Sequence, residues 1–419
     1  MSDAPPRTPT DWSGELMQRR IARRYRAERR FRLLGLAAIA LSAAFLIFLL
    51  GSMLTRGLGG FTETRIALPI DLKAAKLAVD PAHLKGRGAD LALTGAGLED
   101  AVDTAANAAW PAQGGSALLA DGAWLRVREA VKADPTLLNG RATFDLPAAT
   151  AIDIAYKGKG AAEDEATVAA LGAQLSRGFN RDFLTGADST DPTRVGIWGA
   201  LKGSLMTMFV TIALAFPIGV LAALYLEEYA PHNRWTDLIE VSINNLAAVP
   251  SIIFGLLGLA VFLGTFGLPR SAAIVGGLTL ALMTMPVIVI AGRNAIRAVP
   301  PSIRDAALGV GASPVQVVFH HVLPLALPGI LTGTIIGVAR ALGETAPLLM
   351  IGMRAFIAAP PEKLTDPATV LPVQVFLWSD EVNRGFVEKT SAAIVVLLVL
   401  LLAMNGLAIY LRNKFETRW

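Results

Sequence analysis

The sequence predicts an all-α polytopic membrane protein with about six transmembrane helices and a small α+β domain between the first two. Three observations favour this fold class. The composition is 53% hydrophobic and 17% charged, with a mean hydropathy of +0.50, which argues against an ordinary soluble enzyme. Six apolar runs reach the roughly 17 residues needed to cross a hydrocarbon layer as a helix. Residues 55–190 contain no such run.

The first apolar run predicts a membrane anchor that follows a basic segment. The six runs cover residues 33–54, 199–226, 243–267, 271–291, 325–351 and 391–411. Nine arginines in residues 1–32 favour a cytoplasmic N-terminus, and the absence of a small-residue cleavage pattern after residue 54 favours an anchor over a signal peptide. With alternating spans, the short segments assigned to the cytoplasm carry sixteen Lys and Arg and the short outside segments carry five. The tail at 412–419 is therefore also predicted to be cytoplasmic.

The long segment at 55–190 is predicted to form an extracytoplasmic domain. Alternating apolar residues predict strands over 65–72 and 151–158, and acidic residues followed by helical apolar spacing predict a helix over 163–184. An Ala/Gly-rich interior leaves a loosely ordered segment as the alternative. No catalytic constellation is present in this segment, and the absence of cysteine from the chain excludes disulfides and thiolate metal sites.

The connection between the fourth and fifth runs, residues 299–324, predicts two short helices with a sharp corner. Ser302 and Asp305 have the spacing of a capping box, and the glycines of 309–311 suit a helix end. Ser313 and Gln316 form a second capping box around a proline at the first helical position, and Pro324 is expected to stop the second helix. Such a pair exposes small alanines to a partner, or it only links two spans. Spacing alone leaves both readings open.

The same loop resembles the signature cytoplasmic loop of bacterial ATP-binding-cassette importer permeases. That pattern is Glu-Ala-Ala, a Gly six residues after the Glu, and a Leu-Pro that ends thirteen residues after the Gly. Arg304 precedes the matching residues, which are Asp305, Ala306, Ala307, Gly311, Leu323 and Pro324. Aspartate in place of the usual glutamate keeps the charge on a shorter side chain. The resemblance implies a type I importer permease core over 195–411, whose coupling helix docks in a cleft of an ATPase subunit.

Three further segments resemble the permeases of phosphate importers. They are residues 203–230, residues 244–262 and ARALGETAPLLM at 339–350, and the last looks like the PstA-type subunit rather than its PstC-type partner. The resemblance covers roughly residues 195–419 and not 55–190. It implies a complex with a second, PstC-type permease, two ATPase subunits that bind ATP and Mg, and an extracytoplasmic phosphate-binding protein. It implies no cofactor in this chain and no nucleic-acid partner. Independently, the sequence lacks the phosphate-cradling pattern G-x-x-x-x-G-K-[ST].

Arg340 and Glu344 are the two charged residues that lie well inside an apolar run. They follow Leu325 by about 22 and 28 Å along an ideal helix, and their spacing places them on one helical face. One interpretation is an ion pair that fixes helix packing, with Gly333, Gly337 and Gly343 allowing close approach. The other is a translocation path or gate that also includes Thr345 and Pro347. In this second interpretation, Arg340 donates hydrogen bonds to an oxygen of a passing phosphate. Glu344 binds the guanidinium when no phosphate is present, and Pro347 interrupts the helix.

Other classes remain open from the residues alone. A secondary transporter also uses intramembrane charges and proline-broken helices. A receptor is a further rival, but no cytoplasmic output domain follows the last span. Among importers, sulfate or molybdate is the alternative substrate, because one arginine does not discriminate among oxyanions. The basic start orients the chain, and contact with anionic membrane lipid is its alternative role.

Overall fold

The computed structural model describes residues 14–415 except 76, 78, 80–83, 85–87 and 355. The chain divides into two compact units, residues 1–55 and residues 56–419, which are described separately. The described part of the first unit is helix α1, Glu15–Gly57, whose last two residues belong to the second unit. Its 43 residues span about 64 Å, twice the thickness of a hydrocarbon layer. It contains the predicted anchor and part of the basic segment, of which residues 1–13 lie outside the described residues.

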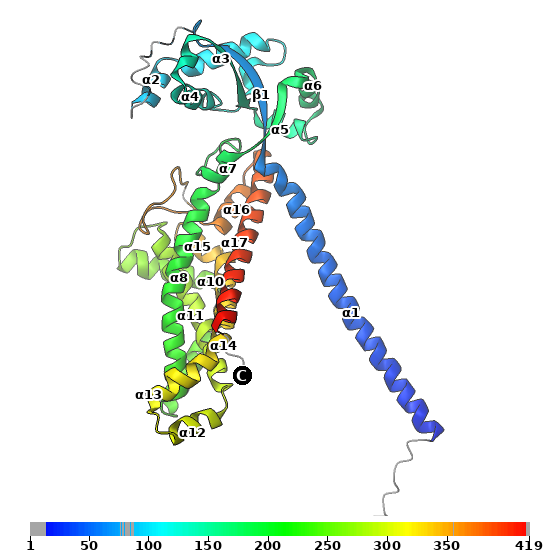
Figure 1. Ribbon diagram of the computed structural model, residues 1–419, viewed down its shortest axis with the longest axis vertical. Coiled ribbons are helices and arrows are strands. Elements are labelled where there is room, and N and C mark those ends of the chain that lie inside the picture. The colour runs from blue at the N-terminus through cyan, green and yellow to red at the C-terminus, as the bar shows by residue number, and fades with distance from the viewer. Residues whose placement is uncertain are drawn as a thin grey trace, which may run out of the picture. The chain divides into compact units, whose positions relative to one another are not determined.

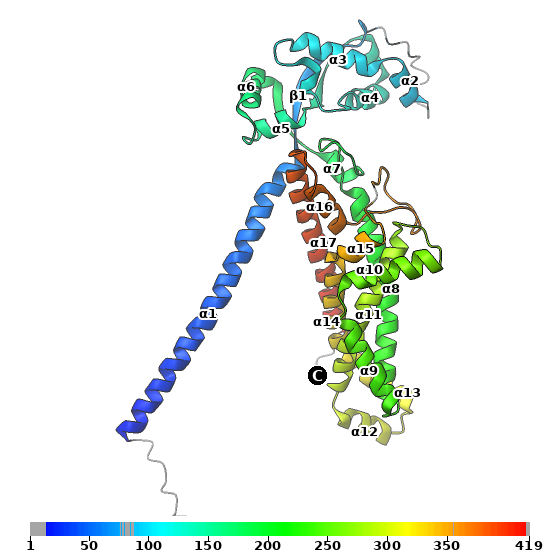
Figure 2. The same ribbon diagram turned by 180° about the vertical axis from the view of Figure 1, so that it is seen from behind.

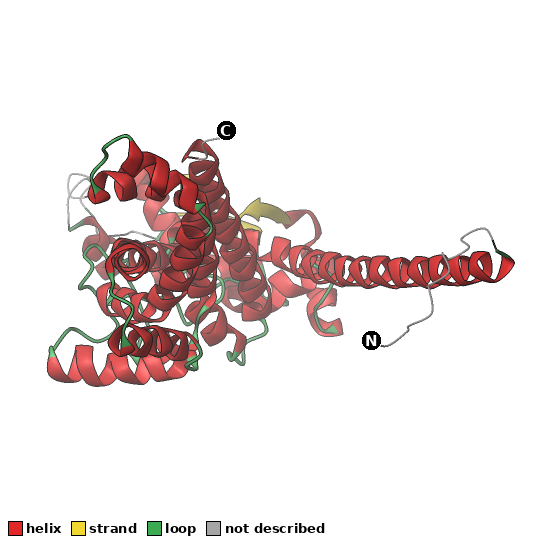
Figure 3. Ribbon diagram, turned by 90° about the horizontal axis from the view of Figure 1, so that it is seen from below, coloured by secondary structure: helices red, strands yellow, loops and turns green. Residues whose placement is uncertain are grey.

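The second unit begins with a small α+β domain. Its antiparallel sheet has the order β2-β1-β3, and Figure 3 shows that the strands are confined to this part of the described chain. The strands are β1 Thr62–Asp71, β2 Arg141–Pro147 and β3 Leu175–Phe179. The helices are η1 Leu58–Phe61, α2 Ala89–Gly95, α3 Leu98–Ala109, η3 Gly115–Leu118, α4 Trp124–Ala133, η4 Pro135–Asn139, α5 Thr150–Tyr156, α6 Ala162–Leu171, η5 Gly172–Gln174 and α7 Arg181–Thr185.

The domain has a hydrophobic core of its own, to which the predicted strand at 65–72 contributes buried side chains. Alternate residues of this stretch point into the core, and Ile66 in the central strand lies opposite Leu146 of β2 and Leu175 of β3. The Ala/Gly-rich stretch folds as α2 and α3, and α3 buries Val102 and Ala106 at helical spacing. The loosely ordered alternative for this stretch is therefore wrong.

Two secondary-structure predictions in this domain are also wrong. Residues 151–158 were expected to form a strand, but they form α5, in which Ile152 and Ala155 are buried one helical turn apart. A seven-residue apolar run fits both periods, so its pattern does not decide between helix and strand. The helix predicted over 163–184 ends at Leu171, because Gly172 adopts a positive φ of 49°, and β3 and α7 follow it.

The remainder of the second unit is a helix bundle. Among the described residues of the whole chain, five helices are long and apolar enough to cross a membrane, and the bent pair α9–α10 makes a sixth if it counts as one span. The bundle helices are α8 Trp198–Leu224, η6 Tyr225–Tyr229, α9 Arg234–Ala247, α10 Ser251–Gly258, η7 Leu259–Thr265, α11 Ala273–Arg297, α12 Pro301–Gly309, α13 Pro314–Gln316, η8 Val317–Val322, α14 Leu323–Gly343, α15 Ala346–Met350, α16 Leu371–Ser379 and α17 Gly385–Phe415. This arrangement confirms the predicted fold class.

Helix α11 lies between α8 and α14, and α14 lies beside α17 (Figures 1 and 2). Small residues allow this close packing, because a Cβ on Gly333 would lie 2.0 Å from Ala291 Cβ of α11 and one on Gly337 would lie 3.0 Å from Thr284. Both glycines thus pack as expected. Gly343 does not, since an added Cβ there meets no atom within 4 Å.

Two of the predicted spans are broken in the structure. Pro250 near the start of the third run predicts a kink there. The structure has a bend of 101° at this point, between α9 and the continuous helix α10–η7. The fifth run was expected to be one helix interrupted at Pro347. Instead α14 ends at Gly343, Glu344 has an extended backbone, and Pro347 lies in the first turn of α15. Proline is well tolerated there because that turn needs no amide donor.

Candidate functional site in the loop joining α11 to α14 and at the end of α14

The loop at 299–324 contains the predicted corner, but its first helix begins differently. Helix α12 starts at Pro301 after an N-cap at Pro300, and Ser302 is exposed and makes no capping hydrogen bond. The capping box of Ser302 and Asp305 is therefore wrong, because the proline at the first helical position sets the start of the helix two residues earlier. Gly311 makes the corner with a φ of 91°.

The second half of the loop begins as predicted and ends differently. Ser313 Oγ accepts from the amide of Gln316, and Gln316 Oε1 accepts from the amide of Ser313, which confirms the second capping box. Pro324 was expected to stop this helix, but α13 continues through the π-helical turn η8 into α14. A wider turn just before a proline accommodates its ring and its missing amide.

The face of the loop that points away from the bundle carries small residues, large apolar residues and one aspartate. Asp305, Ala306 and Gly311 are exposed there. Their large apolar neighbours Leu308, Val310, Val315 and Phe319 are also exposed, Val310 to 86%. Apolar side chains held on a rigid corner are the composition of a protein contact surface. We call six of these residues the outer face of the loop, namely Asp305, Ala306, Leu308, Val310, Val315 and Phe319.

Other predicted loop residues face the bundle instead. Arg304 Nη2 lies 2.7 Å from Glu228 Oε1, its Nη1 donates to Val299 O at 2.7 Å, and its Nη2 also donates to Ile296 O at 3.0 Å. Ala307 is buried. Leu323 and Pro324 are half-buried at the start of α14. These residues hold the loop to the ends of α8 and α11 rather than present it outward.

A network of charged side chains lies next to the contact between Arg304 and Glu228. Arg293 of α11 donates to Glu227 in η6 and, at 2.8 Å, to Glu240 of α9, and Arg297 Nε donates to Glu227 Oε2 at 2.7 Å. Because Glu227 lies at the end of an apolar run, its sequence position predicts that headgroups and water solvate it. In the structure these charges tie α8, α9 and α11 together. The signal that could have found them is an excess of opposite charges at the ends of three helices predicted to lie on one side of the membrane.

Arg340 and Glu344 form a loose pair at the end of α14. Arg340 Nε lies 3.4 Å from Glu344 Oε1, and the two side chains are 49% and 18% exposed. Arg340 makes no other polar contact within the part of the chain that the structure describes. A half-exposed pair of this kind contributes about 0–1 kcal/mol, too little to fix helix packing. The guanidinium therefore has donors available for a further oxygen ligand.

Of the two residues after Glu344 that were predicted to belong to a gate, Pro347 lies against α10. Thr345 is the N-cap of α15, and Pro347 is buried where Gly255 of α10 comes so close that a Cβ would lie 2.7 Å from Pro347 Cα. Helices α10 and α15, one from each broken span, thus pack against each other. Backbone that leaves a helix at membrane depth requires such protein cover.

Comparisons with known proteins show the family to which the chain belongs. A model of the family described as binding-protein-dependent transport system inner membrane component matches residues 215–417, and a model of a domain of unknown function, DUF3333, matches residues 18–166. The phosphate transport system permease protein PstA of Haemophilus influenzae is 31% identical over 224 residues, which are 53% of this chain and 78% of that protein. The chain belongs to the PstA-type permease family.

Other similar proteins include the probable ABC transporter permease protein YqgI of Bacillus subtilis, which is 36% identical over 40% of this chain and 56% of its own length. The chain spans about half the length of the first relatives that it matches, between 50% and 56%. A structure of the MetNI methionine ABC transporter in inward-facing conformations covers 53% of this chain and 98% of that chain at 19% identity, with a TM-score of 0.42. This PstA-type chain is a multi-pass inner-membrane protein.

Proposed function

We propose that this chain is the transmembrane permease subunit of an ATP-driven phosphate importer, in which it forms half of the translocation path and docks an ATPase subunit. The observation that carries the proposal is the identity to a phosphate transport permease over 78% of that relative's length. The apolar outer face of the loop supports the docking role, and the available donors of Arg340 support an anion path.

The partners follow from the same proposal. A PstC-type permease would supply the other half of the path, two ATPase subunits would bind ATP and Mg on the cytoplasmic side, and an extracytoplasmic phosphate-binding protein would deliver the anion. Both termini and the loop at 299–324 would then be cytoplasmic, and the α+β domain would lie outside. The excess of Lys and Arg in the short segments on that side supports this orientation.

In this proposal, the loop residues transmit the motion of the ATPase and the residues at the end of α14 bind the anion. ATPase closure would push on Asp305 and the outer face of the loop, and Arg304 would pass the displacement to Glu228 at the end of α8. At the far end of α14, Arg340 would offer a planar set of N–H donors to a phosphate oxygen, and Glu344 would hold the guanidinium between passages.

The proposal is tested by uptake of labelled phosphate in a strain that lacks this chain and is complemented with variants. We expect Arg340→Ala to abolish uptake while the ATPase still co-purifies, since the loop is untouched. Arg340→Lys keeps a point charge without the fork and is expected to retain a small part of the uptake. Normal uptake by Arg340→Ala would refute the path role. Restoration of sulfate or molybdate uptake instead of phosphate uptake would refute the substrate.

Docking is tested separately with Asp305, which is exposed on α12. Asp305→Lys reverses a charge on the proposed contact surface, and we expect the ATPase to be lost from the purified complex. Reversal of a charge at the rim of an interface acts through electrostatic complementarity rather than through folding of the chain. An unaltered complex would remove Asp305 from the interface.

A further inference from the structure

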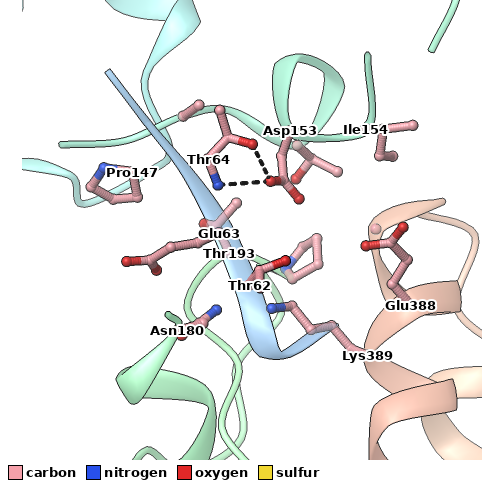
Figure 4. A pocket seen from close by; sticks show the side chains of 14 residues that line it. Thr62, Glu63, Thr64, Pro147, Asp153, Ile154, Asn180, Thr193, Glu388 and Lys389 are labelled. Atoms are coloured by element: carbon pink, nitrogen blue, oxygen red, sulfur yellow. Dashed lines mark hydrogen bonds between the residues drawn. The ribbon is translucent and has the colours of Figure 1, made fainter. Parts of the chain in front are cut away.

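A cluster of buried charges joins the α+β domain to helix α17. Glu388 and Lys389 lie in the first turns of α17, and both are almost fully buried. Figure 4 shows them on one side of a small cavity, with Asp153 of α5 and the start of β1 opposite. We call Asp153, Lys157, Glu388 and Lys389 the junction cluster. No local sequence pattern indicates this cluster, because its members are far apart in the chain.

Lys157, which follows α5, is the centre of the cluster and its side chain is only 5% exposed. Its Nζ lies 2.7 Å from Asp153 Oδ2 and 2.9 Å from Glu388 Oε2, and it also donates to the carbonyl oxygen of Gly59 at 2.9 Å. Lys159 Nζ lies 2.8 Å from the other oxygen of Glu388. One carboxylate of α17 therefore binds two lysines of the domain.

The segment between α1 and β1 is packed tightly between these groups. A Cβ on Gly59 would lie 2.7 Å from Glu388 Oε2, and a Cβ on Gly60 would lie 2.7 Å from Ala392 Cβ of α17. Glycine is needed at both positions because the backbone touches α17 directly. These contacts add a backbone surface to the charge contacts.

Lys389 completes the junction from the side of α17. Its Nζ donates to Gly60 O at 3.1 Å and lies 5.1 Å from the centre of the Phe183 ring in α7. On the domain side, Asp153 Oδ1 accepts from the amide and the hydroxyl of Thr64, at 2.8 and 2.7 Å. The cluster thus reaches from the sheet through α5 to α17 and α7 without an interruption.

A cluster of this kind permits one arrangement of the two parts. A buried charge is tolerated only with its partners in place, and removing one partner leaves the others desolvated and unpaired. A displacement of the domain by a few ångströms relative to α17 would separate both Lys157 and Lys159 from Glu388. A domain attached through a flexible linker would not require a buried group of mutually dependent charge contacts.

We propose that the junction cluster fixes the α+β domain to α17, so that the domain and this helix move as one body. The domain is then a rigid extension of the permease bundle rather than a module on a linker. Helix α17 lies beside α14, which carries Arg340, so a partner bound to the domain would act on the same bundle. Only this last step rests on the proposed function.

The absence of cysteine from the chain allows a direct test with two spin labels. The full-length protein would carry one label at Ala166→Cys on α6 and one at Val399→Cys on α17, both exposed positions. Pulsed electron paramagnetic resonance should give one narrow distance distribution for the labelled parent and a broad one for Glu388→Ala. A broad distribution in the parent, or an unchanged narrow one in Glu388→Ala, would overturn the proposal.

Two further variants test whether the junction cluster behaves differently from an ordinary ion pair. Lys132→Gln breaks the ion pair with Asp90 inside the domain and is the control, with no expected change in width. The exchange Lys157→Glu with Glu388→Lys restores opposite charges but places a carboxylate against the Gly59 carbonyl, so we expect no rescue. A rescued narrow distribution would contradict the role of the backbone acceptor.

Gly59→Ala tests the junction if Glu388→Ala fails to fold. The added methyl group would meet the Glu388 carboxylate without removing any charge, and we expect the same broadening. A narrow distribution in Gly59→Ala would count against the proposal. None of these measurements involves phosphate or ATP, so their outcome is independent of the proposed transport function.

Discussion

Replacing Arg304 with methionine should release helix α12 from the bundle while leaving the outer face of the loop intact. Arg304 reaches the Glu228 carboxylate and the carbonyl oxygens of Val299 and Ile296. The arginine and glutamate side chains are 24% and 11% exposed, so both are partly shielded from solvent screening. Hydrogen bonds to charged groups contribute about 1.5–3 kcal/mol each, and partial exposure reduces this. We therefore expect a loss of about 3 kcal/mol in the docking of α12, or roughly a hundredfold in its local equilibrium.

Hydrogen exchange of the α12 amides in the intact complex measures this loss directly. Exchange from the local open state should rise by about two orders of magnitude in Arg304→Met, and phosphate uptake should fall with it. Ser302→Ala is the matched control on the same helix, because Ser302 is exposed and caps nothing. If Ser302 were the N-cap, its replacement would cost about 1 kcal/mol. Exchange in Arg304→Met within about threefold of the parent would refute the anchoring role of Arg304.

Two further predictions concern stability. Gly333→Ala places a methyl group 2.0 Å from Ala291 Cβ, so we expect a loss of about 1–3 kcal/mol in thermal unfolding of the solubilised protein, whereas Gly343→Ala, with open space around it, should be neutral. Equal effects of the two would contradict the packing of α14 on α11. Burial raises the pKa of the Asp188 carboxyl, although hydrogen bonds including that from Gln374 oppose this, so the folded chain keeps a proton that the unfolded chain loses. Stability should therefore fall as pH rises from the ordinary carboxyl pKa of about 3.9 through the raised value, and Asp188→Asn should gain stability above that window and not below it. A gain that persists at lower pH would contradict this reasoning.

The sequence predicted the features that depend on local patterns. Strand β1, the capping box at Ser313 and the kink at Pro250 each follow from residues close together in the chain. The apolar runs likewise located the spans, because a membrane imposes a length and a composition on each helix. Residues 151–158 were misread because a short apolar run satisfies two periods equally well.

The contacts that hold the candidate site and the junction cluster in place could not be predicted from the sequence. Arg304 and Glu228 are separated by 76 residues, and Lys157 and Glu388 by 231, so no local window contains both partners. Both glutamates lie at the ends of apolar runs, where a solvated charge is the ordinary expectation. Only the packing of the helices shows that they are partnered and largely shielded.

The helix is continuous from Pro314 to Gly343, so a tilt at one end displaces the other end. Twenty-six residues separate Pro314 at the loop from Arg340, which is about 39 Å along the axis of an ideal helix. A tilt of about 5° around one end of such a rod moves the other end by roughly 3 Å, the full length of a hydrogen bond. A motion at the loop that is small compared with a side chain is therefore enough to make or break a contact at the Arg340 guanidinium.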